Sequence, residues 1–380
     1  MKKVGIMSMQ RVYNYGSFLQ AYGLKSLLEE LGCEVQFVDY KVGECLLVEK
    51  KNGKGIKKIL NKSKVTSKLI EYIGFKAPIK EKIKFVLYKK NYGKKNFLLL
   101  GIDKDYNYNP KLDVLIIGSD EVFNCVQSNK NVGFSPELFG ANNNAKKVIS
   151  YAGSFGNTTI DKLKKYKVDK EIGNLLSKFD SISIRDNNSG EIVKKLTGIK
   201  PHYNLDPVLA YDYMNKCKDK IKDIEDKNYI ILYGYSGRFN SEECKKIKEF
   251  AKKENKKIYC FGGVQEACDK FIDCSPFEVL SYFKKADGII TDTFHGTIFS
   301  IITKRKFATV IRKSYGTAYG NEEKLTDLLK RTSLISRIAM NIDDIDKLLN
   351  EDIDYTETFN ILAEERQNTK AYLKKNILGK

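Results

Sequence analysis

The chain has 380 residues and a formal net charge of +19, with 42% hydrophobic and 30% charged residues. Its length exceeds the roughly 250–300 residues at which a single hydrophobic core stops growing, so we expect two domains. No apolar run approaches the roughly 20 residues of a membrane-spanning helix, and the apolar start is too short for a signal peptide, so we expect a cytoplasmic protein. Eight cysteines without a Cys-x-x-Cys pair indicate free thiols rather than a zinc site.

The positive charge is concentrated in one segment. Residues 49–95 carry sixteen lysines against three glutamates, a net charge of +13, which leaves +6 for the rest of the chain. Between residues 56 and 73 the apolar side chains recur at helical spacing with lysines on the other faces. Such a basic amphipathic helix either makes a peripheral contact with an anionic membrane or is a solvated insert. The segment contains no arginine, so we expect no nucleic-acid partner.

The chain begins with a strand, a loop and a helix. Residues 3–9 have the apolar pattern of a strand, and residues 18–31 carry leucines at helical spacing. In the loop between them, Asn14 and Gly16 tolerate left-handed turns and Ser17 can cap the helix. This strand, turn and helix resemble the start of a Rossmann domain, although the dinucleotide fingerprint Gly-x-Gly-x-x-Gly is missing.

An alternation of strands and helices continues to the end of the chain. We predict a first Rossmann-like domain over 1–212 with a lysine-rich helical insert over about 41–111, a linker over 213–228, a second Rossmann-like domain over 229–350 and a final helix within 351–380. The strands end in polar residues, Ser119 and Asp120 among them. Because parallel strands end at one edge of a sheet, these residues would line the cleft between the two domains.

Residues 288–302 read as a buried strand, a sharp loop and the first turns of a helix. Thr291 and Asp292 can cap that helix, and Gly296 and Thr297 would present amide N–H groups to an anion at its N-terminus. His295, one of only two histidines, lies at this point and can give or take a proton near neutral pH. Asp292 and His295 alone are too few ligands for a metal, so no metal is expected.

Cationic residues also follow several predicted strands. Arg11, Arg185 and Arg312 occupy such positions, and the arginine fork suits carboxylates and phosphates. For each one taken alone, the sequence favours a surface charge paired with a neighbouring acid. Their shared placement favours a small polyanionic ligand.

Six stretches of the chain carry a family resemblance. They are Arg-Val-Tyr-Asn-Tyr-Gly-Ser-Phe-Leu-Gln-Ala-Tyr at 11–22, Ile-Gly-Ser-Asp-Glu-Val-Phe-Asn at 117–124, Ser-Tyr-Ala-Gly-Ser-Phe-Gly at 150–156, Ser-Ile-Arg-Asp at 183–186, Asp-Pro at 206–207, and Thr-Asp-Thr-Phe-His-Gly-Thr-Ile-Phe-Ser at 291–300. In this order, over about 300 residues, the chain resembles the polysaccharide pyruvyl transferase family.

The resemblance implies a fold and a reaction. The fold would be α/β, with two Rossmann-like domains facing a cleft as in GT-B glycosyltransferases and a last helix crossing back to the first domain. The donor would be phosphoenolpyruvate, with no further cofactor, and the acceptor a pair of saccharide hydroxyls that becomes a pyruvyl ketal. His295 would be the acid or acid/base and Arg185 would hold the donor, while Asp120 is our candidate base.

Two alternatives follow from the same residues. Asp120 can instead form an Asx turn with its own loop. The fold also suits a nucleotide-sugar glycosyltransferase, for which Glu266 and Glu278 are loosely placed to hold a ribose.

For the pyruvyl transfer, we expect the acceptor to belong to cell-surface or exopolysaccharide biosynthesis. We expect it to be lipid-linked and to reach the protein at the inner face of the membrane.

Overall fold

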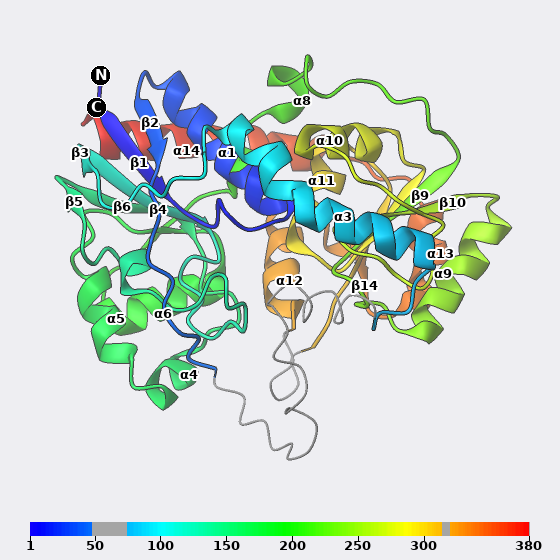
Figure 1. The fold of residues 1–380 in the computed structure, drawn as a ribbon, viewed down its shortest axis with the longest axis horizontal. Helices are drawn as coiled ribbons and strands as arrows, with labels where there is room; N and C mark the ends of the chain where they lie inside the picture. The colour runs from blue at the N-terminus through cyan, green and yellow to red at the C-terminus, as the bar shows by residue number, and fades with distance from the viewer. Residues whose placement is uncertain (48–73, 314–319, 380) are drawn as a thin grey trace.

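The predicted two-domain α/β architecture is confirmed. The computed structural model describes residues 1–47, 74–313 and 320–379, and contains two six-stranded sheets whose pairings are parallel (Figure 1). The amphipathic helix predicted between residues 56 and 73 lies outside the described residues. No described helix is both long and apolar enough to cross a bilayer.

The first sheet has the order β2-β1-β4-β6-β7-β8. Its strands are near-continuous apolar runs, as expected for a parallel sheet covered on both faces. In its centre Met7 pairs with Ile117, and Asp120 pairs with Gly153, so polar groups at the strand ends meet at one edge. The strands are β1 (Lys3–Met7), β2 (Glu34–Phe37), β4 (Val114–Asp120), β6 (Val148–Gly153), β7 (Ser183–Ile184) and β8 (His202–Tyr203), beside a small sheet of β3 (Lys111–Leu112) and β5 (Asn144–Ala145).

The second sheet repeats the design with the order β11-β10-β9-β12-β13-β14. Its central strand β9 pairs with β10 on one side and β12 on the other. The predicted linker lies between β8 and β9. The strands are β9 (Tyr229–Tyr233), β10 (Lys257–Phe261), β11 (Lys270–Phe271), β12 (Gly288–Thr291), β13 (Phe307–Val310) and β14 (Ile338–Ala339).

Helices cover both sheets. They are α1 (Tyr15–Glu30), α3 (Ile79–Asn96), α4 (Ile160–Lys165), α5 (Asp169–Leu176), α6 (Asn187–Thr197), α7 (Pro207–Ala210), α8 (Tyr213–Lys216), α9 (Ser241–Lys253), α10 (Pro276–Lys285), α11 (Phe294–Ile302), α12 (Glu322–Arg331), α13 (Ile345–Asn350) and α14 (Thr356–Leu378), with short 3₁₀ turns η1 (Phe97–Leu100), η2 (Pro136–Phe139), η3 (Ile335–Arg337) and η4 (Ile342–Asp344).

Helix α1 begins earlier than predicted, and its cap is different. Asn14 is the N-cap in an extended conformation with φ −151°, and its side chain accepts a hydrogen bond from the Ser17 N–H. The predictions that Ser17 caps the helix and that Asn14 and Gly16 adopt left-handed turns are therefore wrong. The earlier start places Gly16 and Ser17 inside the first helical turn, with Gly16 against His295 of the second domain and Ser17 against Asp120 of the first.

Helix α14 crosses from the second domain to the first. Near its start, the Thr358 hydroxyl donates to the Thr332 carbonyl, beside α12. Near its end, the Tyr372 hydroxyl donates to the Ser150 carbonyl in β6 at 2.8 Å, and Leu373 is fully buried. The last helix thus packs against the sheet formed by the first part of the chain.

Removing the buried anchor of α14 tests this packing. We expect Leu373→Ala to lower the free energy of unfolding by about 2–5 kcal/mol, because the smaller side chain leaves a cavity in the core. The neighbouring exposed residue supplies the control, since Lys374→Ala removes a side chain without creating a cavity. Urea unfolding followed by circular dichroism measures both. Equal stabilities for the two variants would contradict the docking of α14.

Candidate active site

His295 lies in the first turn of α11, directly after the end of β12. The cap of this helix is Thr293, whose hydroxyl accepts from the Gly296 N–H at 3.0 Å, so the prediction that Thr291 or Asp292 caps it is wrong. Thr291 instead accepts from the Thr293 N–H. A side chain at Gly296 would place its Cβ 2.2 Å from the Thr291 hydroxyl, so glycine is required for this tight turn.

Gly296 and Thr297 hold the turn together in this structure. The Gly296 N–H is used by the Thr293 cap, and the Thr297 N–H donates to the Thr293 carbonyl at 3.1 Å. The Thr297 hydroxyl is buried and contacts Thr309 at 3.1 Å. Their predicted contact with an anion stays a prediction, because both N–H groups already have protein partners.

The first domain approaches His295 through Gly16. A Cβ built on Gly16 would lie 2.2 Å from His295 Nδ1, so a methyl group does not fit between α1 and the imidazole. This glycine is therefore needed for close approach of the two domains rather than for a turn. His295 is 13% exposed and lies at the contact between the two domains.

Asp206 joins His295 to the first domain. The carboxylate caps the short helix α7, with Oδ1 accepting from the Val208 N–H. Its Oδ2 lies 2.8 Å from Arg185 Nη1 and 3.6 Å from His295 Nε2, and the side chain is 1% exposed. The second distance is an ion-pair contact rather than a hydrogen bond. Burial alone would raise the pKa of Asp206, but His295 and Arg185 outweigh it and lower that pKa.

Arg185 is buried between two carboxylates at the end of β7. Its Nη2 lies 3.2 Å from Asp120 Oδ1, and its guanidinium lies 4.3 Å from the centre of the Phe294 ring. Burial works against the charge, but Asp120 and Asp206 raise the pKa of Arg185 and keep it protonated. The residue predicted to hold an anionic donor is thus engaged with protein carboxylates in this structure.

Asp120 ends β4 in a left-handed conformation, with φ +76°. Its Oδ1 accepts from the Glu121 N–H, one residue on rather than the two of an Asx turn, and from Arg185, while Oδ2 accepts from the Ser17 hydroxyl at 3.1 Å. A non-glycine residue in this region costs about 1–3 kcal/mol, and such residues gather at functional sites. Ser119 lies beneath, fully buried, with its hydroxyl donating to Gln20.

A second polar cluster lies at the strand ends of the other sheet. Asp292 accepts from Arg238 at 2.5 Å and from Arg312 at 3.2 Å, and Arg312 also contacts Glu243 at 2.6 Å. Burial opposes the charge of Arg312, but Glu243 and Asp292 outweigh it and raise its pKa. Within the described part of the chain, Asp292 Oδ1 and Arg312 Nη2 are buried without a hydrogen-bond partner.

Arg11 is not part of either cluster. Its guanidinium contacts Asp39 at 2.6 Å, donates to the carbonyls of Asp103 and Asp105, and lies over the Tyr106 ring. Arg11 is therefore a charge paired with a neighbouring acid, which is the alternative considered from the sequence.

A small void lies beside Arg185 and Asp206. It has a volume of about 20 Å³ and is lined by these two residues and Phe294 together with residues of α12. One water needs about 10–15 Å³ by this measure, so the void holds little more than one. Arg331 of α12 lines the void and donates to the Arg185 carbonyl at 2.7 Å, and Lys324 of the same helix contacts Glu121 at 3.0 Å.

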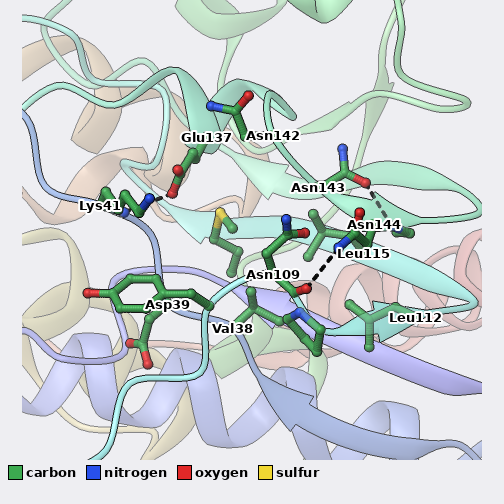
Figure 2. Close-up of a pocket in the computed structure, with 14 residues that line it drawn as sticks. Val38, Asp39, Lys41, Asn109, Leu112, Leu115, Glu137, Asn142, Asn143 and Asn144 are labelled. Carbon is green, nitrogen blue, oxygen red and sulfur yellow. Dashed lines mark hydrogen bonds between the residues drawn. The ribbon is translucent and has the colours of Figure 1, made fainter.

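A larger cavity, of about 140 Å³, lies on another part of the first domain (Figure 2). Figure 2 shows asparagines and the Lys41–Glu137 contact around it. None of the described residues that line this cavity is a histidine. Lys41 is its single cationic lining residue, so it suits a polyanion less well than the arginine clusters do. The lining is Met7, Val38, Asp39, Lys41, Tyr108, Asn109, Pro110, Leu112, Leu115, Glu137, Asn142, Asn143, Asn144 and Ala145.

Sequence reasoning misses three residues of these clusters: Asp206, Arg238 and Glu243. The Asp-Pro motif contains Asp206 but does not reveal its role, which is to contact both Arg185 and His295. Arg238 was missed because it lies five residues beyond the end of β9, in a loop that brings it back to Asp292. A carboxylate directly before a proline at a strand end was the available signal for Asp206.

Comparisons with known proteins give a family and a similar fold. The family model described as "Polysaccharide pyruvyl transferase" matches residues 14–314, which include both clusters. Among solved structures, the UDP-GlcNAc 2-epimerase of Methanocaldococcus jannaschii superposes with a TM-score of 0.50 at 12% identity, covering 98% of this chain and 99% of that one. Acinetobacter baumannii MurG gives 0.41 at 12% identity, covering 100% of both chains. The epimerase likeness concerns the fold alone. Curated proteins give no match.

The fit between Gly16 and His295 can be tested by NMR. We expect Gly16→Ala to displace the His295 imidazole, because the added methyl group would occupy its position. The chain has only two histidines, so His202 serves as an internal reference. A shifted His295 signal with an unchanged His202 signal is the expected result, and two unchanged signals would show that the domains do not meet here.

The charge of Asp206 gives a pH-dependent prediction. Because its pKa is lower in the folded protein than its unfolded value of about 3.9, the carboxylate stabilises the fold above that value, and this contribution is lost as the pH falls through the folded pKa. We expect Asp206→Asn to cost about 3–5 kcal/mol near pH 7, since it leaves buried charge unpaired.

Thermal unfolding of wild type and variant across pH measures this difference, which should shrink below about pH 4. The control is Asp212→Asn, which neutralises a 29% exposed carboxylate 3.6 Å from Arg366 and should change stability little at any pH. A constant difference down to low pH would contradict the role of the Asp206 charge.

Proposed function

Since the chain belongs to the polysaccharide pyruvyl transferase family, we propose that it transfers the pyruvyl group of phosphoenolpyruvate to two hydroxyls of a saccharide and so forms a ketal. The observation that carries the proposal is the cluster of His295, Asp206, Arg185 and Asp120 where the domains meet. It combines a proton carrier, a cation and two carboxylates in a buried place, which are the groups that this reaction needs.

The reaction requires one acid and one base. In the first proposed step, His295 gives a proton to the methylene carbon of phosphoenolpyruvate. A sugar hydroxyl attacks the adjacent carbon and loses its proton to a base. The second hydroxyl then attacks the same carbon, and the C–O bond to phosphate breaks, with phosphate carrying away the remaining proton. Asp206 supports the first step, because its carboxylate lies 3.6 Å from His295 Nε2 and helps to hold the imidazole in position.

The donor carries a carboxylate and a phosphate, so it needs cationic receptors. Arg185 is one candidate, exchanging a protein carboxylate for the donor, and Arg312 is another, because its Nη2 lacks a partner within the described chain. Arginine forks bind such groups with two parallel hydrogen bonds.

The void of about 20 Å³ beside Arg185 and Asp206 is far too small for phosphoenolpyruvate, let alone a sugar. On our proposal the two domains therefore separate to admit the substrates. Closure around bound substrate excludes water, which would otherwise compete with the sugar hydroxyls. We infer that the structure corresponds to the closed arrangement.

A nucleotide-sugar glycosyltransferase is less well supported. The two acids considered for holding a ribose already have structural partners: Glu278 closes the capping box of α10 with Ser275, and Glu266 accepts from the Ser241 hydroxyl at 2.7 Å.

The acceptor of the proposed pyruvyl transfer is a glycan precursor of a cell-surface polysaccharide or exopolysaccharide. On this proposal it is lipid-linked and reaches the enzyme at the cytoplasmic face of the membrane.

Calorimetric titration with phosphoenolpyruvate tests the donor without knowledge of the acceptor. We expect wild type to bind, and Arg185→Ala and His295→Ala to weaken binding by about 10–100-fold, since each loses a charge-assisted contact worth about 1.5–3 kcal/mol. The matched control is His202→Ala, which removes the exposed histidine of β8 and should bind normally. Binding of UDP-sugars in place of phosphoenolpyruvate would overturn the donor assignment.

A further inference from the structure

Helix α3 and the turn η1 present an unusual outward face. Ile79, Ile83 and Leu87 are 77%, 56% and 49% exposed, and Leu98 and Leu99 are 71% and 47% exposed. With Lys90 and Lys94, the three α3 residues follow the spacing of three and four that places side chains on one side of a helix, and Leu98 and Leu99 continue from them in η1. We call this set, 79, 83, 87, 90, 94, 98 and 99, the outer face of α3.

The opposite side of α3 is firmly packed. Phe85, Tyr88 and Tyr92 are at most 3% exposed. Tyr88 contacts Tyr15 of the first domain, and both Phe85 and Tyr88 contact Phe271 of the second, with ring centres about 5.5 Å apart. The buried side thus fixes the orientation of the helix. The outer face lies on the opposite side and is therefore exposed. Figure 1 shows α3 lying across the front of the molecule over both domains.

The exposed apolar residues are concentrated here. Of the fifteen large hydrophobic side chains exposed among the described residues, five lie between residues 79 and 99. Single exposed apolar residues are normal on a protein surface, but a contiguous group marks an interaction site.

The charge on α3 identifies the partner. The helix carries seven lysines and one glutamate, a net charge of +6. That glutamate, Glu81, is 4% exposed and accepts from the Phe271 N–H and from Lys84, so it contributes no acid to the outer face. Each lysine near an anionic lipid surface contributes about 1 kcal/mol, and apolar side chains beside it insert among the lipids.

We propose that the outer face of α3 binds the surface of an anionic membrane, with its isoleucines and leucines at the acyl boundary and its lysines at the lipid phosphates. A second copy of the chain fits poorly, because two such faces would bring lysines against lysines. A nucleic acid also fits poorly, because the outer face has no aromatic side chain on which bases could stack.

The position of α3 relates this surface to the candidate active site. The Tyr92 hydroxyl donates to the Asn14 carbonyl at 2.7 Å, and Lys89 donates to the Tyr13 carbonyl at 2.6 Å. These contacts hold the loop that leads into α1, whose first turn places Gly16 against His295. A lipid-linked saccharide would therefore meet the enzyme on the side where its site lies, an interpretation that rests on the proposed function, whereas the membrane contact itself does not.

Sedimentation with lipid vesicles tests the contact using the whole chain and no substrate. The vesicles are phosphatidylcholine alone or phosphatidylcholine mixed with phosphatidylglycerol. We expect binding to the mixed vesicles that falls with added salt, and little binding to the neutral ones. The triple variant Ile79→Ser, Ile83→Ser, Leu87→Ser should bind at least about tenfold more weakly, because each residue loses apolar burial.

Matched variants elsewhere serve as controls. Ile335→Ser with Met340→Ser changes side chains that are 49% and 64% exposed in the second domain and should leave vesicle binding unchanged. Lys90→Gln with Lys94→Gln should weaken binding about tenfold, whereas Lys245→Gln with Lys248→Gln on α9 should not.

Equal binding to both kinds of vesicle, or a triple variant that binds like wild type, would overturn the proposal. So would tighter binding of the chain to an RNA oligonucleotide than to the mixed vesicles. Because phosphoenolpyruvate is absent from the assay, these outcomes leave the donor assignment to be decided by its own titration.

Discussion

The candidate active site depends on one carboxylate. Asp206 contacts Arg185 from its own domain and His295 from the other, and all three side chains are at least largely buried. Buried charges are tolerated only when they are paired, so the rest of the local structure serves this pairing. Gly16 leaves room for the imidazole, and Asp120 takes a strained backbone conformation while accepting the other half of the Arg185 fork. Two domains can therefore meet at a charged contact without leaving a charge unpaired.

The arginines of both clusters are held by contacts within their own domains that substrates could replace. Arg185 binds Asp120 and Asp206, and Arg312 binds Glu243 and Asp292, so each arginine already contacts carboxylates of the kind that a donor would bring. Exchanging one carboxylate for another costs little electrostatic energy, whereas leaving a buried arginine without any carboxylate would cost more. On our proposal the resting contacts thus keep the receptors in place until the donor arrives.

The sequence was sufficient for the architecture and for part of the site. Apolar strands of the correct length, each followed by polar residues, predicted two parallel sheets, and the loop around His295 was placed correctly at the start of a helix. Caps were predicted less well, because Asn14 and Ser17, or Asp292 and Thr293, are neighbours with similar propensities and only the backbone path selects between them. Arg11 and Arg185 have the same kind of position in the sequence, and the difference between them arises from Asp39 and Asp206, which reach them through the fold.

The return of α14 to the first sheet also has a consequence for the order in which the protein is made. Both ends of the chain lie together at the first domain (Figure 1), so the second domain is an insertion within the first. The ribosome releases residues in sequence, and domains generally fold as units during synthesis. The second domain can fold once its own strands have emerged, but Tyr372 and Leu373 belong to the first domain's core and follow the second domain in the chain. The first domain therefore completes its core only after the whole second domain has been synthesised.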